Sequence, residues 1–178
     1  MAVMYELLLE NEEVFTECQD NPKGYLNMGG FWDFSAFNLE MVEEGVILSG
    51  NITSVWNVQS TDYIEASASI FYLDRGSWQQ TILNMVSRDF CKHMYEDNQL
   101  WYMYWTEHVT NDVRDKCVSL GTTQVIEKYL LKLKFPLDVA LRSGRYKIVF
   151  QFHASDRAGK KRKTSICFEI IGEFTKSQ

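Results

Sequence analysis

The chain has 178 residues, of which 46% are hydrophobic and 14% aromatic, and it contains only two prolines. This composition fits a single folded domain over residues 1–178 with flexible ends, and it excludes extensive disorder. The net charge of −6 argues against nucleic acid as a partner, because nucleic-acid binding needs a basic face.

The N-terminus and the cysteines point to different compartments. The first residues lack the basic region and the long apolar region of a secretory leader. However, an even number of cysteines beside one glycosylation sequon, Asn51-Ile52-Thr53, indicates an oxidising, secretory environment. We therefore expect a secreted protein whose leader has been removed, and a glycan on Asn51 at an exposed turn or strand edge.

Alternation of apolar and polar residues is the dominant pattern along the chain, and it predicts strands with one buried face. It occurs in residues 64–72, 131–137, 145–152 and 165–170. Turn-forming residues separate these and other segments, at 43–45, 74–77, 142–144 and 156–160. Short, regularly spaced strands predict a mostly β fold, either an antiparallel β-sandwich or a β-cup.

One segment in the middle of the chain has helical spacing instead. Ser87 is a typical capping residue, and Phe90, Cys91 and Met94 follow at helical intervals. We predict one short helix near residues 88–96.

The next segment, Leu100 to Trp105, is apolar or amphipathic on both faces. It fits a strand that is buried on both sides. It equally fits the wall or mouth of an apolar ligand cavity, because Trp and Tyr combine an apolar body with one polar tip. Both interpretations stay open.

The four cysteines, Cys18, Cys91, Cys117 and Cys167, allow three disulfide pairings, and the residues alone do not select one. A bridge from Cys91 to Cys117 would stabilise the fold by ~3–4 kcal/mol in the chain-entropy model. None of the four lies within four residues of another, so a metal site is not predicted.

Nothing in the sequence forms a catalytic motif. Cys91 and His93 could suggest a thiol and its base, but residues two apart on a helix point in different directions. The sequence has no nucleophile elbow, phosphate loop or paired-histidine motif. We predict neither an enzyme nor a cofactor.

Lys160-Lys161-Arg162-Lys163 is a basic run in an acidic chain. A solvated hairpin tip is the favoured interpretation. Transient contact with anionic lipid headgroups or with an acidic partner is the other.

Several short motifs follow one another over about residues 14–174. They are Thr16-Glu17-Cys18-Gln19-Asp20, Asn38-Leu39-Glu40, Gly50-Asn51-Ile52-Thr53, Asp89-Phe90-Cys91, Ser143-Gly144-Arg145-Tyr146-Lys147-Ile148, Gly159-Lys160-Lys161-Arg162 and Ile166-Cys167. In this order and spacing they resemble the lysosomal ganglioside-activator family of lipid-binding proteins. The Trp78 and Phe90-Cys91 contexts are also similar to those of insect secreted chemosensory members of this class. The family's membrane-contacting loop tryptophan falls near Ala140, and the cysteines of two further family disulfides are missing.

The resemblance implies a β-cup around a deep apolar cavity, with disulfides Cys18–Cys167 and Cys91–Cys117. It implies a non-enzymatic carrier that presents a lipid to a receptor or an enzyme. The alternative is a secreted interaction protein with a filled core, which would bind a receptor through an exposed aromatic surface.

For the carrier, the predicted cavity lining consists of side chains on the apolar faces of the strands and of the aromatic stretch. These are Leu39, Leu48, Ile64, Ile70, Tyr72, Trp101, Trp105, Leu133, Phe135, Tyr146, Ile148, Phe150 and Phe168.

Overall fold

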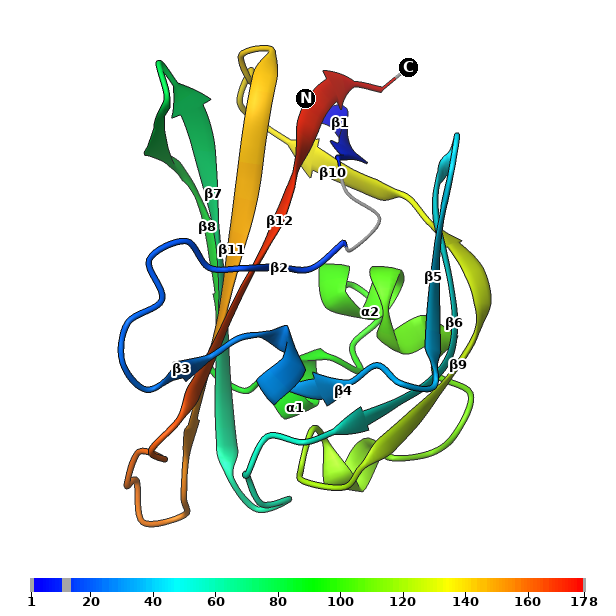
Figure 1. Cartoon of the computed structure of the whole chain (residues 1–178), viewed down its shortest axis with the longest axis vertical. Helices are drawn as coiled ribbons and strands as arrows, with labels where there is room; N and C mark the ends of the chain where they lie inside the picture. The colour runs from blue at the N-terminus through cyan, green and yellow to red at the C-terminus, as the bar shows by residue number, and fades with distance from the viewer. Residues whose placement is uncertain (1, 11–13, 178) are drawn as a thin grey trace.

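The computed structural model describes residues 2–10 and 14–177. The fold is mostly β, as predicted, with antiparallel strands curled into a half-barrel around a buried aromatic core (Figure 1). A large sheet and a smaller sheet face one another, and two short helices lie between them.

The large sheet has the neighbour order β10-β1-β12-β11-β7-β8, and two short strands, β2 and β3, pair with β12. Its long central strands follow the alternating segments of the sequence. Phe150 of β11, for example, lies opposite Ala68 of β7 and Phe168 of β12. The strands are β1 (Val3–Leu9), β2 (Thr16–Glu17), β3 (Tyr25–Leu26), β7 (Tyr63–Asp74), β8 (Ser77–Ser87), β10 (Leu133–Leu137), β11 (Gly144–Ser155) and β12 (Ser165–Lys176).

The smaller sheet joins the large one at a corner. Its β9 pairs with β6, and β10, which begins after the single residue Lys132, pairs with β1 of the large sheet. The chain therefore passes directly from one sheet to the other and closes one side of the half-barrel (Figure 1). The strands are β4 (Trp32–Asp33), β5 (Phe37–Val42), β6 (Gly45–Ser54) and β9 (Thr123–Leu131).

The helix predicted near residues 88–96 is present but shorter, as α1 (Phe90–His93). Its cap is Asp89, whose side chain accepts a hydrogen bond from the Lys92 N–H, and not Ser87. Ser87 instead places its Oγ 2.6 Å from Nδ1 of His93. In the described part of the chain, the other helical elements are three 3-10 turns, η1 (Met28–Gly30), η2 (Thr106–His108) and η3 (Arg114–Lys116).

The strand interpretation of the aromatic stretch is wrong, because this segment forms a second helix, α2 (Leu100–Tyr104). Trp101 and Trp105 are four residues apart, and this spacing directs both indoles to one side of the helix. That side faces the core, where Trp105 is only 5% exposed. Of residues 100–105, only Met103 is exposed.

Aromatic rings fill the space between the sheets around α2. Trp32 of β4 stacks on Trp105 with ring centroids 4.8 Å apart, and Phe31 stacks on Trp32 at 4.5 Å. Phe90 of α1 packs edge-on against Phe152 of β11 in the large sheet, with ring centroids 5.0 Å apart. This part of the half-barrel is therefore a packed core.

Both disulfides have the pairing that the resemblance implies, Cys18–Cys167 and Cys91–Cys117. Cys167 lies in register with Gln151, on the face of β12 opposite to Ile166 and Phe168. It is nevertheless buried, because the segment that carries Cys18 lies over this outer face. The strand is thus covered on both sides, although its sequence alternates.

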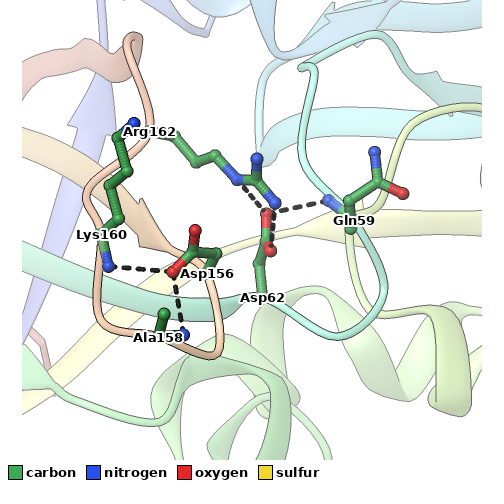
Figure 2. Close-up of polar contacts among 6 residues, drawn as sticks. All are labelled: Gln59, Asp62, Asp156, Ala158, Lys160 and Arg162. Carbon is green, nitrogen blue, oxygen red and sulfur yellow. Dashed lines mark hydrogen bonds and ion pairs between the residues drawn. The ribbon is translucent and has the colours of Figure 1, made fainter.

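The basic run forms the turn between β11 and β12, and one of its cations has a structural role (Figure 2). Arg162 makes two hydrogen bonds to the buried carboxylate of Asp62, at 2.7 and 2.8 Å. Asp62 also accepts the N–H of Gln59 at 2.9 Å. Asp156 holds the turn by accepting the N–H groups of Ala158 and Lys160.

This ion pair predicts a specific loss of stability in acid. Burial alone would raise the pKa of Asp62, but the hydrogen bonds from Arg162 and Gln59, with the charge of Arg162, outweigh it and lower that pKa. A lowered pKa contributes stability that is present above the unfolded-state pKa, about 3.9 for Asp, and is lost as pH falls through the folded-state value.

The free energy of unfolding of Asp62→Asn should therefore lie below that of the wild type at pH 5–7, and the two should converge below about pH 4. Urea unfolding at a series of pH values measures this difference. Asp156→Asn, in the β11–β12 turn that also carries Arg162, serves as the control. A difference that stays constant down to pH 2 would contradict the assignment.

Candidate functional site

An open hollow of about 250 Å³ lies at one end of the half-barrel, between the large sheet and the segment that connects β10 to β11. We call it the groove. It lies at the end of the sheet that carries the β7–β8 turn, and the basic hairpin lies at the other end (Figure 1). The groove is lined by Tyr72, Thr81, Ile82, Leu83, Val139, Ala140, Leu141, Arg142 and Tyr146.

Tyrosine hydroxyls fix the loop that forms one wall. Burial raises the pKa of Tyr146, so its hydroxyl remains protonated and can act as a donor. Hydrogen bonds to three successive backbone groups leave the wall with a defined position. Tyr5 Oη accepts the Leu141 N–H at 3.0 Å, Tyr146 donates to the Arg142 carbonyl at 2.8 Å, and Tyr72 donates to the Ser143 carbonyl at 3.4 Å.

A bulge in β8 forms the opposite wall. Residues 81–83 stand opposite the single residue Ile70 of β7. The Thr81 hydroxyl stabilises the bulge by donating to the Ile70 carbonyl at 2.7 Å and accepting the Leu83 N–H at 3.1 Å. The extra length pushes Ile82 outward, where its side chain is 84% exposed.

The groove is apolar, with one charge. Of the described residues that line it, only Arg142 is charged, and its guanidinium carbon lies 5.7 Å from the centroid of the Tyr72 ring. Among the described residues, no carboxylate forms an ion pair with Arg142. The site can therefore hold an apolar body beside a cation.

Only Tyr72 and Tyr146 of the predicted cavity residues line the groove, and Leu133 lines a second hollow of about 160 Å³ beside β1 and the β5–β6 turn. The whole predicted set packs in or against one aromatic core. The buried members are Leu48, Ile64, Trp105, Leu133, Tyr146, Ile148 and Phe168, and the partly buried ones are Leu39, Ile70, Tyr72, Trp101, Phe135 and Phe150.

Sequence reasoning missed the rest of the groove. Thr81, Ile82 and Leu83 belong to a bulge, and residues 139–142 belong to a loop, so neither segment shows the period of a strand. The signal in the sequence was the uncharged segment Trp78 to Val86, which is rich in β-branched and other apolar residues.

Several buried side-chain donors, among them Gln124 Nε2 and Thr106 Oγ1, find no acceptor among the described residues. Within residues 2–10 and 14–177, the indole N–H groups of Trp32 and Trp101 also have no acceptor. Two other core indoles are paired, since Trp105 donates to Gln124 Oε1 at 2.8 Å and Trp56 donates to Thr164 Oγ1 at 3.1 Å.

Cys91 and two of the histidines have partners within the fold. Cys91 is bonded to Cys117, so the thiol interpretation of Cys91 and His93 is wrong. His153 Nε2 lies 2.7 Å from the Tyr25 hydroxyl, and His108 Nδ1 lies 2.9 Å from Glu127 Oε1.

Asn51 of the sequon lies on β6, between β5 and β9, with its side chain exposed. The expectation of an exposed position is met. The expected turn or strand edge is wrong, because Asn51 pairs with Val125 and its N–H donates to the Ala36 carbonyl.

In the described part of the chain, no three His, Cys, Asp or Glu side chains are grouped so that they could hold a metal ion. No helix in that part has the length and apolar character needed to cross a bilayer. A comparison with protein-family models finds no match for this chain, and a search of curated proteins finds none either.

Proposed function

We propose that this protein is a secreted, non-enzymatic carrier that binds a lipid or another apolar small molecule in the groove and presents it to a receptor or an enzyme. The observation that carries the proposal is an apolar hollow whose walls are held by hydrogen bonds between side-chain hydroxyls and the backbone. Preformed apolar hollows with few polar groups are the usual form of small-molecule sites.

Exposed apolar side chains beside the groove support this proposal. Ile82 is 84% exposed and Met85 is 53% exposed. A ligand that covers such surface gains about 25 cal/mol per Å² before the costs of ordering. An exposed apolar patch of this kind is typical of a binding site.

Secretion and glycosylation belong to the same proposal. Two disulfides fit an oxidising compartment. The exposed side chain of Asn51 is accessible to glycosylation. A transient contact with a membrane surface would deliver or collect the ligand.

Displacement of a fluorescent fatty-acid probe tests the carrier function. Leu83→Glu places a charge in the apolar wall and should weaken probe binding at least about tenfold, since burying an unpaired charge is costly. Val86→Glu is the matched control, because Val86 is exposed on the same strand but does not line the groove. If the wild type binds no probe, or Leu83→Glu binds it equally well, the groove is not a carrier site.

A protein-interaction function is the second candidate, and the β8 edge favours it. Edge strands are normally protected by charges or proline, as the opposite edge β10 is by Lys134 and Pro136. β8 contains neither, and it exposes Ile82, Met85 and Val86. In the aromatic stretch of residues 100–105, in contrast, only Met103 is exposed, so the stretch offers no such surface.

A further inference from the structure

We propose that the ligand is a long-chain carboxylic acid, with its chain in the groove and its carboxylate on the guanidinium of Arg142. This inference rests on the proposed carrier function and assigns the chemical class of the ligand.

The hydrogen-bonding capacity of the groove carries the inference. Three of its lining residues have hydroxyls, and each hydroxyl proton is already used. Thr81 donates to the Ile70 carbonyl, Tyr72 to the Ser143 carbonyl and Tyr146 to the Arg142 carbonyl. Among the described lining residues, the side chain of Arg142 is therefore the only one with free donors, so the polar end of a ligand should be an acceptor.

Because Arg142 is positively charged, the acceptor at the polar end of the ligand should be an anion. A guanidinium stays protonated at all physiological pH values, so a wholly apolar ligand would displace its water without replacing the lost hydrogen bonds. A carboxylate replaces them with short, charge-assisted bonds and can engage the fork of N–H groups at two points. The chain as a whole carries a net charge of −6, so a local cation has to supply the attraction for an anion.

The side chain of Arg142 is exposed, but its backbone carbonyl and its guanidinium both have defined neighbours. Its carbonyl is held by Tyr146 at 2.8 Å, and its guanidinium lies over the Tyr72 ring. The groove, at about 250 Å³, is smaller than typical drug-sized sites of about 300–1,000 Å³. This size favours a single acyl chain over a ligand with several chains.

Titration of the full-length protein with myristate and with its methyl ester tests the inference, because the two share one chain and differ in charge. At pH 8 and low salt, the wild type should bind myristate about tenfold more tightly than the ester. Arg142→Gln should remove this preference and leave the affinity for the ester within about twofold of wild type. Added salt should weaken myristate binding and leave the ester unaffected.

Arg157→Gln is the matched control, because Arg157 is an exposed arginine on the hairpin at the other end of the sheet. Arg142→Lys should restore part of the preference, which a merely structural role of Arg142 would not require. If Arg142→Gln keeps the preference, or a monoacyl phosphate binds more tightly than myristate, the carboxylate inference is overturned while groove binding stands. If the wild type binds neither myristate nor its ester, the carrier function itself fails.

Discussion

Replacing Glu169 by Gln should lower the free energy of unfolding by about 3–5 kcal/mol, because it leaves a buried ammonium group without its anion. Lys147 Nζ lies 2.9 Å from Glu169 Oε2, and the two side chains are only 7% and 6% exposed. The ammonium also lies 4.7 Å from the centre of the Trp78 ring. Chemical denaturation measures the loss.

Two variants separate the missing charge from other effects. Glu173→Gln, on the same strand but exposed, should change stability by less than about 0.5 kcal/mol. The double variant Lys147→Met with Glu169→Leu removes both charges and should recover most of the loss, because apolar replacements of a buried pair are often neutral. A double variant that is less stable than Glu169→Gln would show that packing, and not the unpaired charge, dominates.

This ion pair shows where sequence reasoning about the fold stops. The alternation in residues 145–152 and 165–170 predicts β11 and β12 and places Lys147 and Glu169 on the polar, outward faces. The ammonium of Lys147 lies beside the rings of Phe71 and Trp78. The burial of Glu169 depends on the segment around Cys18 and Gln19, since the Gln19 N–H donates to Glu169. Because this segment lies about 150 residues away in the sequence, the residues around Glu169 contain no local pattern that predicts its burial.

The helix α2 was missed for a related reason. Residues 100–105 are apolar or amphipathic on every face, so periodicity cannot distinguish a buried strand from a buried helix. The four-residue interval between Trp101 and Trp105 fits a helix, but it is too short a pattern to exclude a strand. The packing of both indoles in the core decides between the two.

The candidate site was less predictable than the fold. The sequence predicts that Tyr72 and Tyr146 face inward, and both line the groove. The remaining lining residues come from a bulge and a loop, whose positions depend on hydrogen bonds to Thr81 and to three tyrosines. Arg142 is part of a predicted turn, and its place beside Tyr72 follows only from the fold of that loop.

Removing the two disulfides separately should give unequal losses of stability. In the chain-entropy model, the cost rises with the logarithm of the loop that a bridge closes. Cys18–Cys167 spans 149 residues and Cys91–Cys117 spans 26. The double variant Cys18→Ala with Cys167→Ala should therefore lose about 5 kcal/mol, and Cys91→Ala with Cys117→Ala about 3.5 kcal/mol.

The two deletions should differ in their loss of stability by more than the chain-entropy model gives. Gln19 follows Cys18 directly and donates to Glu169, so release of Cys18 also weakens the cover over the buried ion pair. Combining the Cys18–Cys167 deletion with Glu169→Gln should thus cost less than the sum of the separate losses, since the two changes disrupt one region. Urea unfolding of both deletion variants and of the combination measures these terms. Strictly additive losses, or a larger loss from the Cys91–Cys117 deletion, would contradict this coupling.

Neither bridge lines the groove, so variants that remain folded should bind the fatty-acid probe with the wild-type affinity.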